Sequence, residues 1–373
     1  MFLKNLSLVN FKNYREAEFE FHDKVNCFVG NNGEGKTNIL DAIYYLSFCK
    51  SFFNPSDSQN VLHDESFFLV QGEFEKEGET DKIYCGVKKG QQKIFKKNKA
   101  EYDRLADHIG GYPLVMISPS DSILIYEGSE ERRKFIDGII SQYDKEYLDH
   151  LIQYNKALAQ RNALLKLFFK ERRFDAESLE IWNEQLSNHG KYIFEKRAAF
   201  IKSFEPIFQE YFQIISGKKE TVELEYQSQL AAIDFIEALQ NSVDEDLRKQ
   251  FSTVGVHKDE LQFNIGGHPL KKFGSQGQQK SYLIALKVAQ MEFLKQIKKV
   301  NPILLLDDIF DKLDENRVMH LLDLVNSRKF GQIFITDTHP ERIEQLLRTV
   351  KGEHKMFEIE KGSVKRVWHE EKK

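Results

Sequence analysis

Cysteine is scarce in this chain and forms no recognisable pattern. The 373 residues contain three cysteines, Cys27, Cys49 and Cys85. An odd number of cysteines, without CxxC or Cys/His spacing, argues against a disulfide framework and against a structural zinc site. We therefore expect three buried thiols.

Long apolar runs are also missing. No stretch reaches the roughly 20 apolar residues that a membrane-spanning helix needs. Polar residues interrupt the opening segment MFLKNLSLVNFKNY, where a secretory signal would have an apolar block. Internal repeats and low-complexity segments are absent too. The sequence predicts a cytoplasmic protein without a membrane partner.

The chain has no excess of positive charge, because 54 lysines and arginines face 58 aspartates and glutamates. A nucleic-acid partner would therefore need positive potential that is concentrated in patches. One patch lies in the stretch from Lys82 to Lys99, which has no acidic residue and carries Lys88, Lys89, Lys93, Lys96, Lys97 and Lys99. On a hairpin these lysines would follow a DNA phosphate backbone. The alternative is a hairpin whose lysines only keep an edge strand soluble.

A second basic cluster contains Arg132, Arg133 and Lys134. It adjoins Glu130 and Glu131, so helical pairing accounts for part of its charge. We rank this cluster below the lysine hairpin as a DNA contact.

Hydrophobic periodicity predicts an α/β protein with a helical insertion. An N-terminal hairpin precedes a strand at 25–29 and a helix that carries apolar residues at helical spacing, and short strands of a β subdomain follow at 67–99. Two long amphipathic helices begin after residue 144, with a charged connector at 170–180, and should form an antiparallel pair. An α/β pattern returns after residue 255, with a helix at 281–294 and strands at 303–306 and 332–336. We divide the chain into domains 1–118, 119–250 and 251–373.

A phosphate-binding loop is predicted between the strand at 25–29 and the following helix. Its segment fits G-x-x-x-x-G-K-[ST] and reads Gly30, Asn31, Asn32, Gly33, Glu34, Gly35, Lys36 and Thr37, with Asn38 next. Glycines let backbone N–H groups turn toward phosphate oxygens at a helix N-terminus. Lys36 would bridge the β- and γ-phosphates of ATP and serve catalysis, and Thr37 would bind Mg²⁺. The alternative for the loop alone is an ordinary glycine-rich turn.

The strand at 303–306 ends in two carboxylates, Asp307 and Asp308. This is the form of a buried central strand that opens onto a ligand crevice. Asp307 would hold the Mg²⁺ shell, and Asp308 would orient or deprotonate the attacking water. The alternative is a strand that simply ends in solvated carboxylates.

A serine- and glycine-rich motif begins the helix ahead of that strand. Ser275, Gly277 and Gln278 in this motif resemble an ABC signature, which binds the γ-phosphate of ATP held by another subunit. An isolated Ser275 would be read as an ordinary helix N-cap. The order of motifs favours the signature, because Asp311–Asp314 match a D-loop and His339 follows the next strand, near the γ-phosphate switch position.

The resemblance to a family rests on further segments. They are Leu8–Tyr14, Ser118–Asp121, Gly128–Ser129, Arg132–Asp137 and Gly255–Leu261, together with the signature. In this order, over nearly the whole chain, they resemble the RecF family among SMC-like DNA ATPases. Val256 and Lys258 depart from the family pattern, which more often has proline and arginine there.

The resemblance implies an ABC-type ATPase head with a β subdomain and an inserted helical domain. It also implies an ATP-dependent homodimer with weak, DNA-stimulated ATPase activity that acts as a switch. The implied partners are single-stranded, duplex or gapped DNA and the proteins RecO and RecR, which help to load RecA during repair and replication restart. Three alternatives stay open: another SMC-like head, a transporter nucleotide-binding subunit and a small-molecule kinase.

Overall fold

The computed structural model describes residues 1–217, 220–309, 331–349 and 353–370. Contacts divide the chain into two compact units. The sheet unit consists of Met1–Asp121, Ile214–Lys218 and Lys280–Lys373, and the helical unit consists of Ser122–Gln213 and Lys219–Gln279. The first change of unit falls at 121/122, and the division into domains at 118/119 and 250/251 stays a prediction.

The first sheet of the sheet unit is antiparallel, in the order β2-β1-β4-β5-β6-β7. Its strands are β1 (Phe2–Phe11), β2 (Tyr14–Glu20), β4 (Phe67–Lys76), β5 (Glu79–Lys88), β6 (Ile94–Lys97) and β7 (Ala100–Glu101). Buried and exposed side chains alternate along β1, β2 and β5, as in a sheet with one solvated face. The predicted hairpin and the strands at 67–99 are confirmed, and β4 pairs with β1, so both belong to one sheet.

The second sheet has the order β15-β14-β3-β13-β12-β8, and only β15 runs antiparallel to its neighbour. Its strands are β3 (Val25–Val29), β8 (Leu114–Ile117), β12 (Ile303–Asp307), β13 (Ile333–Asp337), β14 (His354–Glu360) and β15 (Ser363–Glu370). The strands β3, β8, β12 and β13 are buried at every residue, as their unbroken apolar runs predict. Register places the carboxyl ends of β3, β12 and β13 side by side, which is where open α/β sheets bind ligands.

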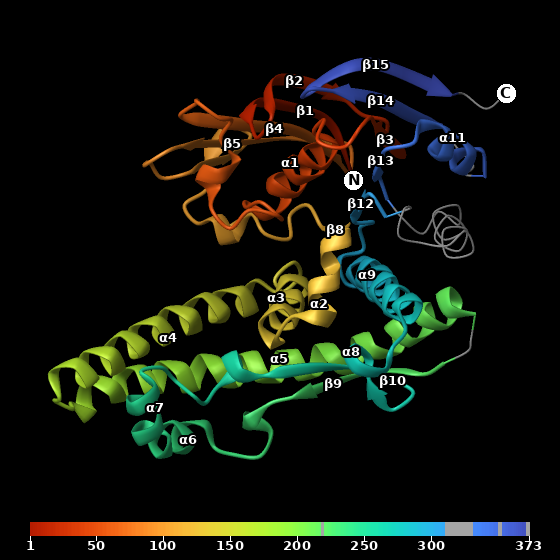
Figure 1. Cartoon of the computed structure of the whole chain (residues 1–373). Coiled ribbons are helices and arrows are strands. Elements are labelled where there is room, and N and C mark those ends of the chain that lie inside the picture. Colours follow the sequence, from red (N-terminus) through yellow and green to blue (C-terminus); the bar gives the residue numbers. More distant parts are fainter. Residues whose placement is uncertain (218–219, 310–330, 350–352, 371–373) are drawn as a thin grey trace. The chain divides into compact units, whose positions relative to one another are not determined.

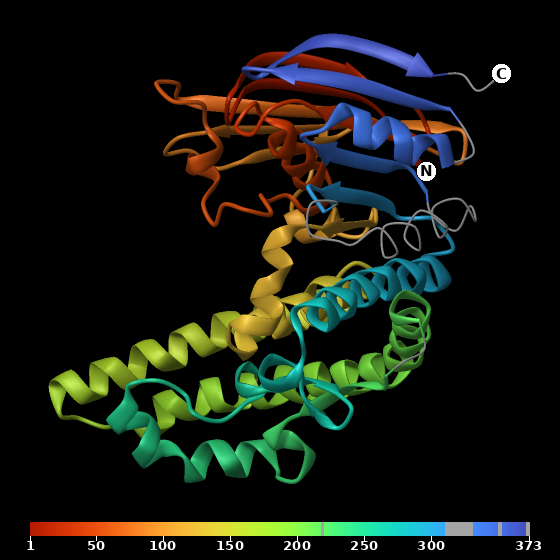
Figure 2. The same cartoon turned by 45° about the vertical axis from the view of Figure 1, so that its right-hand side comes forward.

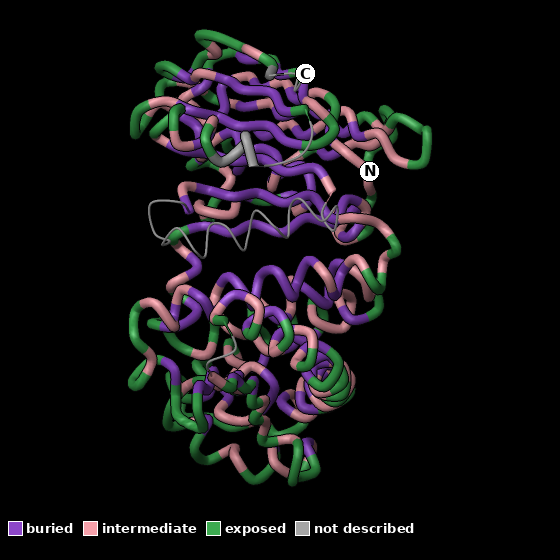
Figure 3. Tube along the Cα trace, turned by 90° about the vertical axis from the view of Figure 1, so that its right-hand side faces the viewer, coloured by how far each residue is buried: buried purple, intermediate pink, exposed green. Residues whose placement is uncertain are grey.

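Helix α1 (Lys36–Phe48) contacts strands of both sheets and therefore lies between them (Figure 1). Phenylalanines fill the space beside it: the Phe21 and Phe334 ring centroids are 4.9 Å apart, and Phe28 and Phe357 are 5.3 Å apart. Figure 3 shows the resulting buried band of strands in purple. The only helix after β13 in the described part of the unit is α11 (Pro340–Thr349). One core thus fixes the edge where the predicted phosphate loop lies.

The helical unit is built on a long antiparallel helix pair, as predicted (Figure 2). The helices are α4 (Lys145–Glu171) and α5 (Ala176–Ser216). The Lys196 Nζ lies 2.6 Å from Asp144 Oδ2, and Arg161 Nε donates to Asn183 Oδ1 at 2.7 Å. Contacts thus move toward the start of α5 as the chain advances along α4, so the two helices run antiparallel. The break between the helices covers only residues 172–175, so most of the predicted connector is helical.

Short elements complete the helical unit. They are α2 (Ile123–Tyr126), α3 (Ser129–Ile140), α6 (Phe235–Asn241), α7 (Val243–Lys249), α8 (Leu270–Phe273), β9 (Val222–Gln227), β10 (Glu260–Ile265) and β11 (His268–Pro269). Helix α9 (Gln276–Lys298) begins in the helical unit and continues in the sheet unit. No helix in the described ranges is long and apolar enough to cross a membrane.

Candidate nucleotide site and signature helix

The predicted phosphate loop lies between β3 and α1, as its motif requires. Gly30, Gly33 and Gly35 have φ values of 150°, 83° and 113°, in a region that side chains disfavour. A Cβ atom at Gly30 would lie 2.4 Å from the Ile359 carbonyl oxygen of β14. The first glycine is therefore required by the neighbouring strand as well as by the loop's own turn.

The loop surrounds a hollow of 140 Å³ in the sheet unit. Its lining residues are Asn32, Gly33, Gly35, Lys36, Thr37, Asn38, Asp308 and Thr336. No hydrogen bond from the N–H groups of Gly33, Gly35 or Lys36 to another described part of the chain is present. Such N–H groups at the positive end of a helix dipole favour an anion, so the loop has the chemistry of a phosphate cradle.

Lys36 is held inside this loop. Its ammonium donates to the carbonyl oxygens of Gly30 at 2.7 Å and Asn31 at 2.8 Å. Burial lowers the pKa of Lys36, and the nearby carboxylates of Asp308 and Asp307 act in the opposite direction. The lysine thus lies between the loop and the acidic strand end, where it would meet phosphate oxygens.

The strand end and the loop meet through three oxygens. Thr37 Oγ1 and Thr336 Oγ1 both donate to Asp307 Oδ1 at 2.8 Å, and the Asp308 backbone N–H donates to Thr336 Oγ1 at 3.0 Å. Burial raises the pKa of Asp307, while the two threonine hydroxyls lower it. A threonine hydroxyl beside a carboxylate fits Mg²⁺, which prefers hard oxygen ligands. Thr37 and Asp307 lie together as predicted, whereas Thr336 was missed although it is a polar residue at the end of a buried strand.

Two residues near the N-terminus support the loop from outside. Asn13 Nδ2 donates to the Glu34 carbonyl at 3.0 Å, and Asn13 Oδ1 accepts from Asn38 Nδ2 at 2.7 Å. The Tyr14 hydroxyl donates to the Gly35 carbonyl at 3.1 Å. Both residues end the opening segment Leu8–Tyr14 that carried the family resemblance, but no sequence pattern assigned them a role in the nucleotide site.

A second support comes from the C-terminal part of the chain, where no motif was recognised. The turn between β14 and β15 places two residues with positive φ, Lys361 (48°) and Gly362 (70°), against the loop. The Lys361 N–H donates to the Glu34 carboxylate, and the Gly362 N–H donates to the Glu34 carbonyl at 3.0 Å. Glu34 is thereby fixed by backbone groups that no local pattern reveals.

Strand β13 ends in an acidic residue, Asp337. Asp337 is fully buried, and it accepts from the His339 N–H at 2.7 Å and from Arg342 Nη2 at 2.6 Å. The side chain of His339 is 65% exposed and lies 2.8 Å from Thr338 Oγ1. His339 is not among the residues that line the hollow, so its switch role stays a prediction. The predicted D-loop at 311–314 lies outside the described residues.

The signature motif forms the start of α9. The Ser275 N–H donates to Gln278 Oε1 at 2.5 Å, and the Gln278 N–H donates to Ser275 Oγ at 3.2 Å, which is a reciprocal capping box. Ser275 is exposed and Gly277 is half-buried. The N-cap interpretation of Ser275 therefore holds in this structure. It leaves the serine exposed, where a second subunit would have access to it.

The six lysines of the predicted DNA-binding hairpin differ in their surroundings. Lys93 is held by Asp57 at 2.8 Å and the Cys49 carbonyl at 2.6 Å, and only 14% of its side chain is exposed. Lys97 pairs with Asp81 at 2.8 Å, and Lys89 donates to the Glu65 carbonyl at 2.8 Å. In the described chain no ion pair involves the remaining three, Lys88, Lys96 and Lys99. Charge available to a phosphate backbone is thus concentrated in those three lysines.

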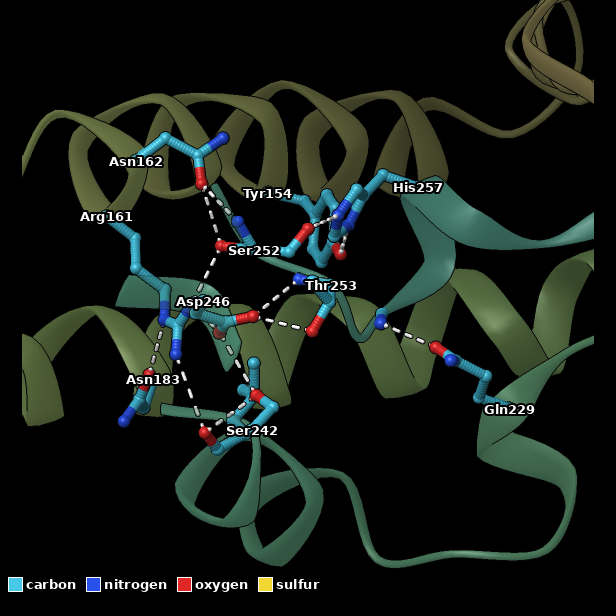
Figure 4. Close-up of polar contacts among 12 residues, drawn as sticks. Tyr154, Arg161, Asn162, Asn183, Gln229, Ser242, Asp246, Ser252, Thr253 and His257 are labelled. Atoms are coloured by element: carbon cyan, nitrogen blue, oxygen red, sulfur yellow. Dashed lines mark hydrogen bonds and ion pairs between the residues drawn. The ribbon is translucent and has the colours of Figure 1, made fainter. Parts of the chain in front are cut away.

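The segment Gly255–Leu261 belongs to a polar network in the helical unit (Figure 4). His257 Nδ1 lies 2.8 Å from the Tyr154 hydroxyl, and its Nε2 lies 3.0 Å from the Ser252 carbonyl. Arg161 and Asp246, both with fully buried side chains, pair at 2.6 Å. The segment therefore fastens β10 to the long helix pair, and its buried members are structural.

Comparisons with known proteins agree with this geometry. The family profile described as RecF/RecN/SMC N terminal domain matches residues 2–358. A Flavobacterium johnsoniae protein described as DNA replication and repair protein RecF is 54% identical over 359 residues, which cover 96% of this chain and 100% of that protein. A Bacteroides fragilis protein of the same description is 51% identical over 373 residues and 100% of both chains.

Solved structures extend the comparison to the fold. A structure described as the recombination mediator protein RecF with ATP in the RecFOR pathway has a TM-score of 0.88 at 31% identity and covers 99% of this chain and 98% of that one. The Smc head domain of Pyrococcus furiosus has a TM-score of 0.57 at 18% identity, covers 99% and 96% of the two chains, and shows the fold alone. The predicted ABC-type ATPase head is confirmed. With a family profile and curated relatives that extend over nearly its whole length, this chain belongs to the RecF family.

Proposed function

We propose that this protein is an ATP-dependent DNA-binding protein of recombinational repair and replication restart. The main observation behind this proposal is the phosphate loop, beside which Lys36, Thr37 and Asp307 lie together. Backbone N–H groups and the Lys36 ammonium would bind the triphosphate of ATP, and Thr37 with Asp307 would hold Mg²⁺. When bound, Mg²⁺ would neutralise charge that develops on the phosphates.

ATP would act mainly by joining two copies of the chain. Ser275 is exposed at the N-terminus of α9, and Gly277 and Gln278 beside it are half-buried, a position suited to the γ-phosphate of ATP held by another copy. Because ATP would then contact both partners, binding favours the dimer by mass action. Asp308, which lines the hollow beside Lys36, would orient or deprotonate water for slow, DNA-stimulated hydrolysis.

The shared-site proposal is tested by measuring the mass of the protein with and without ATP. Lys36→Ala should stay monomeric, since it loses the charge that meets the phosphates. Asp308→Asn should bind ATP and dissociate more slowly than wild type, because hydrolysis would no longer release the dimer. A wild-type protein that remains monomeric at saturating ATP and DNA refutes the proposal.

DNA is the proposed partner, and the repair role follows the relatives described as RecF and as members of the RecFOR pathway. RecO and RecR would act with this protein to load RecA at gapped DNA. On the lysine hairpin, Lys88, Lys96 and Lys99 are the proposed phosphate contacts, because Lys93 is engaged with Asp57. Changing the three to glutamate should weaken DNA binding and flatten its dependence on salt while ATP binding survives. Unchanged DNA affinity would remove this assignment.

A further inference from the structure

Two of the segments that carried the family resemblance, Arg132–Asp137 and Gly255–Leu261, meet in the helical unit. Arg132 Nε donates to Glu260 Oε1 at 2.8 Å. Arg197 of α5 joins Asp137 and Asp259, one from each segment, with a distance of 2.9 Å to each carboxylate. Arg197 and Asp259 are almost completely buried. These contacts build a rigid scaffold from both segments.

Two cations on this scaffold have no carboxylate partner within 4.0 Å in the described ranges: Arg133 and Lys258. Arg133 Nη1 donates to the backbone carbonyl of Asp259 at 2.6 Å, beside Lys258 in the chain. The Lys258 ammonium lies 4.7 Å from the ring centroid of Phe251, which is 41% exposed. The aromatic ring thus holds one cation at the surface, and the scaffold holds the other.

Electrostatic effects act on these two cations in both directions. Burial lowers the pKa of Lys258, the nearby charges of Arg133 and Lys249 lower it further, and Asp246 acts in the opposite direction. Burial and then Arg197 lower the pKa of Arg133, whereas three nearby carboxylates raise it: Asp259, Asp137 and Glu130. Keeping like charges side by side is unfavourable, and an anion would relieve it.

Neighbouring cations provide a contrast. Lys134, the next residue after Arg133 on α3, pairs with Glu131 at 2.7 Å and Glu130 at 2.9 Å. Lys249 pairs with Glu245 at 2.6 Å. Both are more exposed than Arg133, yet their charge is locally balanced. Among the described residues, the lack of a carboxylate within 4.0 Å therefore distinguishes Arg133 and Lys258 from these two neighbours.

We propose that Arg133 and Lys258 form a second DNA contact, in which both cations bind backbone phosphates. This inference rests on the proposed function and assigns it a surface in the helical unit. Guanidinium and ammonium groups beside an exposed aromatic ring suit a nucleic acid, whose phosphates alternate with stackable bases. In a chain with net charge −4, a local excess of positive charge is what such a partner requires.

The test compares two double variants of the full-length protein. Arg133→Gln/Lys258→Gln removes the unbalanced cations, and Lys134→Gln/Lys249→Gln removes two balanced ones. A fluorescent duplex of about 30 base pairs, longer than a single site needs, is titrated with ATP present between about 50 and 200 mM salt. The first variant should flatten the slope of log K against log salt by about 1.8, for two lost phosphate contacts, and the second should retain the wild-type slope.

A charge-keeping variant separates charge from folding. Arg133→Lys/Lys258→Arg should recover most of the slope, whereas a structural effect of the substitutions would leave it flat. If wild type binds DNA and the two neutral variants bind alike, this inference is refuted while the proposed function stands. If wild type does not bind DNA, the proposed function itself fails. The partner could instead be an acidic protein, which a polyglutamate resin tests. If the resin retains wild type but not Arg133→Gln/Lys258→Gln, and that variant binds DNA as wild type does, the partner is an acidic protein and the inference is refuted.

Discussion

The buried ion pair in Figure 4 allows a quantitative prediction for Asp246→Asn. Asp246 Oδ2 accepts from Arg161 at 2.6 Å and Ser242 Oγ at 3.0 Å, and Asp246 Oδ1 accepts from the Thr253 N–H at 2.8 Å and Thr253 Oγ1 at 2.6 Å. Asparagine removes the charge that compensates Arg161, which costs about 3–5 kcal/mol in a buried pair. The NH₂ group of the asparagine also replaces one carboxylate oxygen of Asp246 and would face the hydrogen-bond donors that this oxygen had accepted from. We expect the free energy of unfolding to fall by about 4 kcal/mol.

The assay measures urea unfolding of the whole protein with a fluorescent reporter in the helical unit. The chain has two tryptophans, so Trp368→Phe leaves Trp182 of α5 as the fluorescent reporter. With a urea dependence of about 2 kcal/mol per molar, the midpoint should fall by about 2 M. The matched control is Glu245→Gln, because Glu245 is the preceding residue, carries the same charge and is 48% exposed in its pair with Lys249.

Two outcomes decide this reasoning. If Asp246→Asn lowers the midpoint no further than Glu245→Gln, the pair does not have the buried energetics that its geometry implies. Replacing both partners, as in Arg161→Met/Asp246→Leu, should recover much of the loss, because no charge is then left buried alone. A double variant that is as unstable as Asp246→Asn would contradict that explanation.

Three further predictions concern pH, the phosphate loop and a backbone turn. Burial lowers the pKa of His257 from 6.5 to about 4, so the unfolded chain binds the proton at a higher pH than the folded chain does. The stability that is present above about pH 6.5 should therefore be lost as the pH falls toward 4. Melting temperatures that do not fall over this range would contradict the burial of a neutral His257. Asn13→Ala removes contacts that support the phosphate loop but no residue predicted to bind ATP. In titrations with a fluorescent ATP analogue, this change should weaken binding about 5- to 30-fold. Unchanged affinity would show that the loop keeps its shape without Asn13. Gly255→Ala would place a Cβ 2.4 Å from the Tyr154 hydroxyl at a φ of 133° and should lower the urea midpoint, whereas Gly138→Ala in α3, with nothing within 4 Å, should not.

Local patterns predicted the parts of the site that lie within one segment. The loop from Gly30 to Thr37 and the pair Asp307–Asp308 were identified because each follows a buried strand, and strand ends meet at one edge of a parallel sheet. The antiparallel helix pair was predicted in the same way from apolar periodicity. These features need only short-range information.

The missed residues depend on register between distant segments. Thr336 reaches Asp307 because β13 lies beside β12, an order that no local motif specifies. Asn13 contacts Asn38 because the sheet that contains β1 packs against α1. Lys93 looked like a free surface charge, yet the fold places Asp57 within 2.8 Å of it. Sequence patterns identify which groups are present but not which partners tertiary contacts supply.

The turn at Lys361 and Gly362 has a consequence for anyone who shortens or tags this protein. A version that stopped at Glu360 would retain every residue predicted to bind ATP, and inspection of its motifs would find nothing missing. It would still lack the two backbone N–H groups that bind Glu34, as well as β15, the only antiparallel partner of β14 in the described sheet. Strand β14 lies against β3, which leads into the phosphate loop. In the shortened protein, β14 would be an edge strand, and the phosphate loop would lose part of its support. Strand β15 is therefore part of the support of the phosphate loop and not a dispensable tail.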